Sequence, residues 1–156
     1  MRVEIAAVGR LRAGPELSLI QDYLKRFDRS GRGLGLGPTT VHEVEGKKGG
    51  GRAAEAALLS RAIPHGAVRV ALDERGRQMS SPDFAATLAG WRDAGRGDVG
   101  FLIGGADGLA PDLSDGADLV LSFGPMVWPH MLARVMLAEQ LYRAASILAG
   151  APYHRV

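Results

Sequence analysis

The ten residues Val99-Gly100-Phe101-Leu102-Ile103-Gly104-Gly105-Ala106-Asp107-Gly108 are the stretch that decides the fold class of this chain. Residues 99–103 are mostly apolar and predict a strand, because a short apolar run bounded by turn residues is typical of one. Gly104 and Gly105 end that strand at once. The loop that begins at Gly104 therefore lies at the carboxyl end of a predicted strand.

The same alternation of strand, turn and helix extends outward in both directions. Strands are predicted over Val3–Val8, Thr39–Val44, Ala67–Leu72 and Leu119–Phe123. Helices are predicted over Pro15–Phe27, Ala53–Ala62, from a Ser80 cap to about Ala94, and over about His130–Ala149, with loops at Arg29–Gly37 and Gly46–Arg52. Strands that alternate with helices indicate an α/β fold with a mostly parallel sheet and helices on both faces. Because such sheets bind ligands at the carboxyl ends of their strands, the loops after Leu72, Ile103 and Ser122 are the places to seek a site.

Composition excludes several classes of protein. The chain has 156 residues and a mass of 16.5 kDa, which predicts a single domain, and 46% hydrophobic with 23% charged residues is ordinary globular usage. The absence of cysteine excludes disulfides, thiolate metal sites and a cysteine nucleophile. No targeting signal or membrane span is expected, so we predict a cytoplasmic protein. No metal site is expected either, because the histidines are scattered at His42, His65, His130 and His154.

Net charge alone does not make the chain a nucleic-acid binder. The formal charge is only +2, although the pI is about 9.3 and Arg is much commoner than Lys. The glycine-rich stretch Gly46–Arg52 carries three cations but lacks the Gly-Lys-Ser/Thr of a phosphate-binding loop. It is either a solvated surface loop or one that attracts phosphates by charge.

The turn at Gly104–Gly108 also has more than one interpretation. It is not a G-x-G-x-x-G motif, and no acid follows at the spacing of a dinucleotide-binding unit. Its glycines allow either a tight turn with close packing or a close approach of backbone to a ligand.

The connection between the last strand and the last helix is unusually apolar. It consists of Phe123, Gly124, Pro125, Met126, Val127, Trp128 and Pro129. A connection this short is normally polar. An apolar loop stiffened by proline, at a strand's carboxyl end, suits a purine or another flat ligand. The alternative is that this connection is a buried crossover between the strand and the helix, which would also account for its apolar residues.

The last helix and the tail add two further expectations. Apolar residues cover more than one stripe of the helix, which predicts burial against the sheet and against a second copy of the chain. Within it, Glu139 and Arg143 are four residues apart and most simply form an ion pair. The tail, Tyr153, His154, Arg155 and Val156, offers a stacking ring, an imidazole and a guanidinium, or else is a frayed end.

Taken together, these segments resemble one family. The resemblance rests on Leu-Ile-Gly-Gly-Ala-Asp-Gly-Leu (Leu102–Leu109), Trp-Pro-His (Trp128–His130), the helical segment Arg134–Ala144 and Pro-Tyr-His-Arg (Pro152–Arg155). They are similar to the RlmH family of small SPOUT-class methyltransferases, which act on pseudouridine in bacterial large-subunit ribosomal RNA. Val8-Gly9, Tyr23–Phe27 and Leu72-Asp73 match as well, so the resemblance spans nearly the whole chain. Asp107 stands where the family commonly has Glu, and Trp128 where a smaller apolar residue or Phe is frequent.

The resemblance implies a fold, a cofactor and partners. It implies one SPOUT domain over residues 1–156, with a trefoil knot in the C-terminal part, and S-adenosyl-L-methionine as methyl donor. The donor-binding positions that it implies are Leu72, Gly104, Gly105, Phe123, Gly124, Pro125, Met126, Val127 and Trp128. It also implies a homodimer in which the tail of one subunit lies near the cofactor pocket of the other.

The implied reaction is methyl transfer to N3 of a pseudouridine in the 23S rRNA of the assembled 70S ribosome. Tyr153, His154 and Arg155 are expected to hold the flipped base. His130 or Arg143 is expected to stabilise negative charge on its carbonyls, with Glu139 orienting Arg143. Two other classes stay open from the residues alone: a ribosome-associated module without catalysis, and a flavodoxin-type domain that binds a nucleotide or flavin.

Overall fold

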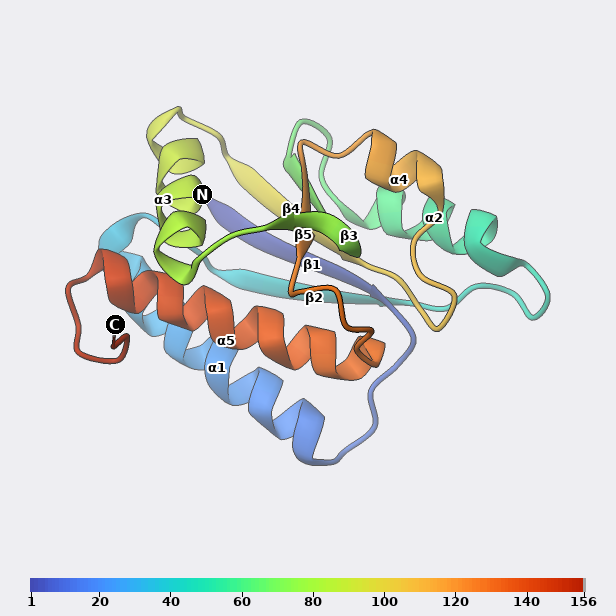
Figure 1. Ribbon diagram of the computed structural model, residues 1–156, viewed down its shortest axis with the longest axis horizontal. Coiled ribbons are helices and arrows are strands. Elements are labelled where there is room, and N and C mark those ends of the chain that lie inside the picture. The colour runs from blue at the N-terminus through green and yellow to red at the C-terminus, as the bar shows by residue number, and fades with distance from the viewer. Residues whose placement is uncertain (156) are drawn as a thin grey trace.

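A five-stranded sheet in the order β2-β1-β4-β3-β5 lies at the centre of the computed structural model, which describes residues 1–155 (Figure 1). The strands are β1 (Arg2–Val8), β2 (Thr39–Val44), β3 (Val68–Gln78), β4 (Asp98–Ile103) and β5 (Leu119–Ser122). All four pairings are parallel, which confirms the predicted sheet. Flavodoxin-type sheets have the order 2-1-3-4-5 instead, so this topology excludes that alternative. The expected tail residue Val156 lies outside the described residues.

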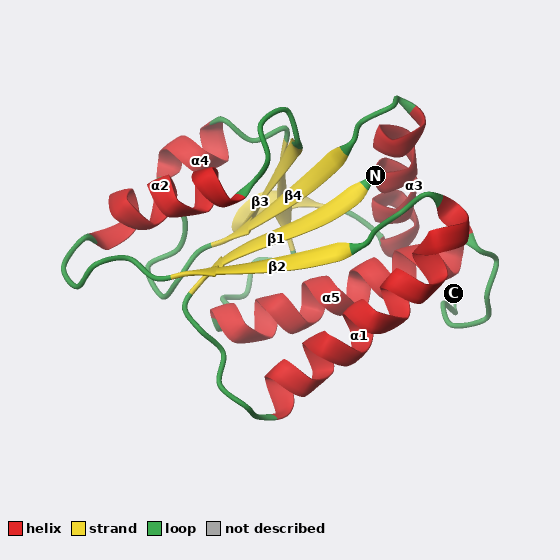
Figure 2. Cartoon of the chain, turned by 180° about the vertical axis from the view of Figure 1, so that it is seen from behind, coloured by secondary structure: helices red, strands yellow, loops and turns green. Residues whose placement is uncertain are grey.

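Helices cover both faces of the sheet, as predicted (Figure 2). They are α1 (Pro15–Gly31), a 3-10 turn (Arg32–Leu34), α2 (Gly51–Ala62), α3 (Ser81–Asp93), α4 (Pro111–Asp115) and α5 (His130–Leu148). The helices α1, α3 and α5 lie on one face, and α2 and α4 lie on the other. Successive residues of one strand therefore pack into different cores. In β4, Phe101 packs on the side of α1, α3 and α5, and Leu102 packs on the side of α2 and α4.

Several predicted loop and strand boundaries were wrong. The predicted loop Gly46–Arg52 is shorter, because α2 begins at Gly51. The segment Arg29–Gly37 is not all loop, because it holds the last turn of α1 and the 3-10 turn. Gly31 approaches the backbone of Leu36 so closely that a Cβ would overlap its carbonyl oxygen, so this glycine serves packing. The five-residue α4 was not predicted, since it is too short to show a helical period.

The strand β3 also runs beyond its predicted end at Leu72. Leu72 and Arg77 both pair with Leu121, so residues 73–76 form an irregularity in the ladder. Gly76 is required there, because a Cβ would lie 2.7 Å from the carbonyl oxygen of Val120. This detour presents the side chains of Asp73, Glu74 and Arg75 at the carboxyl end of the sheet, where the site described next is found.

Candidate active site

A cavity of about 730 Å³ opens at the carboxyl ends of β3, β4 and β5. Three loops that are far apart in the sequence form its walls: residues 72–75, 103–109 and 123–130, with Arg52 at the edge. The loops after Leu72, Ile103 and Ser122, in which the sequence predicts a site, are thus the loops that line this cavity. Of the nine expected donor-binding residues, six line this cavity: Leu72, Gly104, Gly105, Phe123, Val127 and Trp128.

The other three lie elsewhere. Gly124 lines a second cavity of about 480 Å³ on the far side of Phe123. Pro125 and Met126 are exposed at the tip of the loop and line neither cavity.

The glycine turn that forms one wall has no room for side chains. A Cβ on Gly104 would lie 2.5 Å from the carbonyl carbon of Gly108, so only glycine fits. The amide of Gly108 donates to the carbonyl oxygen of Gly105 at 3.0 Å, and Gly108 has a φ of 75°. The turn is therefore tight, as one of the two interpretations predicts, and its backbone lines the cavity.

The apolar loop that forms the opposite wall is exposed, which excludes a buried crossover. The exposed fractions are 70% for Met126, 78% for Val127 and 42% for Trp128. Ser122 fixes the start of this loop, because its hydroxyl donates to the carbonyl oxygen of Glu74 at 2.9 Å and accepts from the amide of Gly124 at 3.0 Å.

His130, at the start of α5, closes the cavity from below the loop. Its Nδ1 is buried and has no hydrogen-bond partner within residues 1–155. One turn further along, the buried Arg134 forms an ion pair with Glu43 at 2.9 Å and donates to the carbonyl oxygens of Val8 and Gly9, both at 2.6 Å. Sequence reasoning did not find the partner Glu43, since no local signal links residues 91 positions apart.

Charged groups rim the cavity as well. Asp73 accepts from the Arg75 backbone amide at 2.9 Å and from the guanidinium at 3.2 Å. The Arg75 guanidinium holds the pKa of Asp73 below its ordinary value. The cavity thus combines apolar and backbone walls with a small number of ionised side chains at its edge.

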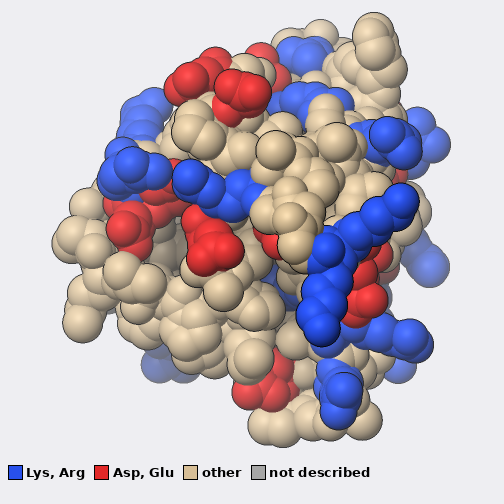
Figure 3. All heavy atoms as spheres, turned by 90° about the vertical axis from the view of Figure 1, so that its right-hand side faces the viewer, with Lys and Arg blue, Asp and Glu red and all other residues tan. Residues whose placement is uncertain are grey.

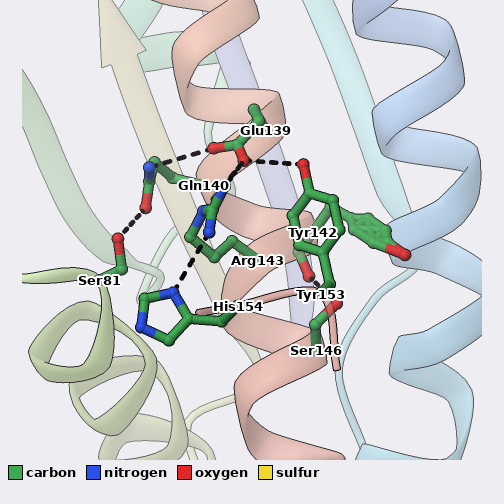
Figure 4. A network of polar contacts seen from close by, with 8 residues as sticks. All are labelled: Ser81, Glu139, Gln140, Tyr142, Arg143, Ser146, Tyr153 and His154. Atoms are coloured by element: carbon green, nitrogen blue, oxygen red, sulfur yellow. Dashed lines mark hydrogen bonds and ion pairs between the residues drawn. The ribbon is translucent and has the colours of Figure 1, made fainter. Parts of the chain in front are cut away.

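The tail residues gather at a second place, the middle of α5 (Figure 4). Arg143 donates to Glu139 Oε1 at 2.7 Å, which confirms the predicted ion pair. The Tyr153 hydroxyl donates to the same oxygen at 3.0 Å, and Arg143 lies 3.2 Å from His154 Nδ1. Gln140 extends the network to the Ser81 hydroxyl at 2.7 Å.

Burial and the Glu139 carboxylate raise the pKa of Tyr153 far above its ordinary value, so its hydroxyl remains a donor. Glu139 likewise raises the pKa of Arg143. The tail is therefore not frayed through His154. Arg155 is exposed and makes no hydrogen bond to another residue of the described chain. The expected catalytic residues are thus divided: His130 faces the first cavity, whereas Arg143, Tyr153 and His154 form the cluster beside the second.

Several solved structures share this α/β fold at low sequence identity. The fold is shared with a probable methylase family protein from Haemophilus influenzae, at a TM-score of 0.56 and 10% identity over 99% of this chain and 70% of that one. It is also shared with TrmJ from Zymomonas mobilis (TM-score 0.53, 14% identity, 92% of this chain and 70% of that one). A probable methyltransferase from Bordetella pertussis gives a TM-score of 0.52 at 16% identity, over 92% of this chain and 96% of that one.

The class of protein is shown by sequence: the family model described as "Predicted SPOUT methyltransferase" matches residues 1–154, and the chain belongs to this family. A relative from Dinoroseobacter shibae is 72% identical over 156 residues, which are 100% of both chains. Others from Ruegeria pomeroyi (70%, 100% of both) and Paracoccus denitrificans (69%, 99% of both) are nearly as similar. All three are named Ribosomal RNA large subunit methyltransferase H. The chain is therefore a methyltransferase enzyme, and its family implies a methyl donor of the S-adenosylmethionine type.

The cavity fits such a donor on observations of this structure. The Gly104–Gly108 turn is a cradle that a Cβ would fill, Leu72, Phe123 and Trp128 offer apolar walls for a purine, and the His130 Nδ1 lacks a partner. Among residues 1–155, no three His, Asp or Glu side chains gather so that they could hold a metal ion. No helix in the described part of the chain is long and apolar enough to cross a membrane.

Proposed function

We propose that this protein transfers the methyl group of S-adenosyl-L-methionine to N3 of a pseudouridine in the 23S rRNA of the assembled 70S ribosome. One observation carries the proposal: the strand-end cavity fits the donor in a chain whose relatives, 65–72% identical over essentially their whole length, are named Ribosomal RNA large subunit methyltransferase H.

When bound, the donor supplies an electrophilic methyl group on a sulfonium, so the protein has mainly to align the acceptor and stabilise its anion. Leu72, Phe123 and Trp128 enclose a flat heterocycle, while the backbone of Gly104 and Gly105 lies against the same space. Val127, Gly124, Pro125 and Met126 complete the loop that would close over the donor. These side chains exclude water and orient the donor.

The cluster of Glu139, Arg143, Tyr153 and His154 would hold the acceptor. Imide N3 gives up its proton to solvent water when it becomes nucleophilic, and negative charge then lies partly on the neighbouring carbonyl oxygens. Arg143, which Glu139 keeps charged and oriented, is suited to stabilise this charge, as is His130 at the donor cavity. Arg155, exposed and next to the cluster, would contact the flipped base together with Tyr153 and His154.

The assembly belongs to the same proposal. The tail cluster and the donor cavity occupy different places on one chain, which supports a homodimer in which the tail of one subunit serves the donor pocket of the other. The exposed apolar side chains of Leu19 on α1 and Leu132 on α5 support a second copy against these helices. We further propose a single cytoplasmic SPOUT domain over 1–156. We also propose that its C-terminal part forms a trefoil knot, as in the family that it resembles.

The test has two stages. Calorimetric titration of the purified protein with S-adenosyl-L-methionine should give saturable binding. Transfer of a labelled methyl group should then occur to 70S particles that lack the modification, and nuclease digestion should place the label on N3 of pseudouridine. Donor binding without transfer would overturn the proposed acceptor. Absence of donor binding, with ribosome binding retained, would favour a ribosome-associated module without catalysis.

A further inference from the structure

A basic surface lies at the carboxyl ends of β1 and β2, beside the mouth of the donor cavity. We define it by five exposed side chains: Arg10, Arg12, Lys47, Lys48 and Arg52. None of them forms an ion pair with an acid of the described chain, unlike six other arginines, at positions 2, 26, 75, 92, 134 and 143. Figure 3 views this end of the molecule, where Lys and Arg side chains are spread around the face with acidic groups between them.

The fold places these cations on separate loops that leave the same end of the sheet. Strands β1 and β2 pair in parallel up to Val8 and Val44, so the loops that follow them leave the sheet side by side. Arg10 and Arg12 follow β1, and Lys47 and Lys48 follow β2. Arg52, in the first turn of α2, lines the donor cavity and joins the surface to its mouth.

Hydrogen bonds hold the backbone of both loops in place, whereas the cationic side chains form no ion pair within the described chain. The amide of Leu11, between the two arginines, donates to Glu43 Oε2 at 2.7 Å, and Glu43 is in turn fixed by Arg134. The amide of Gly50 donates to the carbonyl oxygen of Lys47 at 2.9 Å and closes a turn. Long side chains that project from anchored backbone, without an internal partner, suit an external anion.

We propose that this basic surface binds the phosphate backbone of the ribosomal RNA acceptor. The inference rests on the proposed function and adds to it the face by which the substrate arrives. The cations outnumber the acids of the same loops and of α2, Glu45 and Glu55, and the acid nearest the arginines, Glu43, is neutralised by Arg134. An RNA strand that reached the cavity across any other face would leave these charges unused.

The experiment compares three double variants with equal loss of charge. Arg10→Gln/Arg12→Gln and Lys47→Gln/Lys48→Gln remove cations of the surface. Arg29→Gln/Arg32→Gln is the matched control: both arginines are exposed, neither forms an ion pair within residues 1–155, and they lie at the end of α1, at the opposite end of the sheet. Binding to 70S particles and to protein-free large-subunit rRNA is measured at several salt concentrations, and donor affinity is measured by calorimetry.

Each surface variant should weaken binding to both probes about 10-fold and lower the slope of log affinity against log salt by about 1 to 2. The control should behave as the wild-type protein, and donor affinity should be unchanged in all three. Equal effects of surface and control variants would overturn the inference. So would a loss confined to 70S particles, which would indicate an acidic ribosomal protein as the partner. If the wild-type protein itself transfers no methyl group to ribosomes, the proposed function fails first, and this outcome is distinct from the others.

Discussion

At Gly104 the protein has no space for a single methyl group, and this makes the residue a sensitive test of the donor cavity. In Gly104→Ala the new Cβ must displace the backbone of Gly108, at a cost of about 1–3 kcal/mol. Donor affinity, measured by calorimetry, should therefore fall about 10- to 100-fold. Gly90→Ala is the control, because a Cβ on this exposed helical glycine meets nothing within 4 Å. Wild-type affinity in Gly104→Ala would show that the turn does not contact the donor.

The Tyr153 hydroxyl is a second single-atom test, this time of the tail cluster. Tyr153→Phe keeps the ring beside Tyr142 and Arg143, at 4.6 and 4.8 Å, but removes the hydrogen bond to Glu139. A hydrogen bond to a charged group contributes about 1.5–3 kcal/mol, so kcat for transfer should fall about 10- to 100-fold while donor affinity stays constant. Tyr142→Phe is the matched control, because its hydroxyl does not bond Glu139. If Tyr153→Phe and Tyr142→Phe had equal activities, the Tyr153 hydroxyl would have no role in methyl transfer.

The Asp73–Arg75 pair predicts a pH effect with a definite sign. Because the pKa of Asp73 is lowered on folding, its ionised form stabilises the folded state above the ordinary carboxyl pKa. That stabilisation is lost as the pH falls through the lowered value. In Arg75→Gln the pKa of Asp73 should rise, as followed by carbon NMR of the carboxyl group. Arg77→Gln is the control, because Arg77 is exposed and does not contact Asp73; it should leave the titration of Asp73 unaltered. If Arg75→Gln also left the midpoint of that titration unaltered, Arg75 would not be the group that lowers the pKa of Asp73.

At the scale of elements, Arg134 ties the first half of α5 to the ends of β1 and β2. Arg134→Met removes the ion pair with Glu43 and leaves the carbonyl oxygens of Val8 and Gly9 without this donor. We expect a loss of about 3–5 kcal/mol in the free energy of unfolding, measured in urea by circular dichroism. Arg2→Met breaks the ion pair with Asp98, in which the Arg2 side chain is 64% exposed, and should cost no more than about 1 kcal/mol. Similar losses in the two variants would mean that Arg134 does not anchor the helix.

The elements themselves were mostly predictable, whereas their irregularities were not. The strand Thr39–Val44 and the Ser80 cap follow from local pattern, and the structure has both as predicted, with the Ser80 hydroxyl accepting from the amide of Asp83. The detour at residues 73–76 depends on pairing with β5, more than forty residues away, and no local period contains that information. The cavity could be located because parallel strands bring their ends together. Other contacts could not be located in this way: that of Glu43 with Arg134 depends on packing between distant segments.

At the scale of the whole molecule, the exposed apolar side chains of α1 and α5 predict a second copy. Light scattering at micromolar concentration should give a dimer of 16.5 kDa chains. Leu132→Glu, on α5, should shift the protein toward monomer, since a charge would be buried in the interface. Val41→Glu introduces the same charge at a similarly exposed site on the edge strand β2 and serves as control. A monomeric wild-type protein would contradict the homodimer.

The contact between α1 and α5 also has a consequence for how the chain is made. The apolar side of α1, with Leu24 and Phe27, is covered by Leu137 and Leu141 of α5, and Tyr23 meets Tyr142 edge to face at 6.3 Å. The first of these helices to leave the ribosome during synthesis thus lacks its packing partner until α5 has been translated. Sequence-distant contacts of this kind slow folding and leave apolar surface exposed in the meantime. The nascent protein should therefore acquire its native structure only after α5 has emerged, and a chain arrested before α5 should remain a substrate for chaperones and proteases.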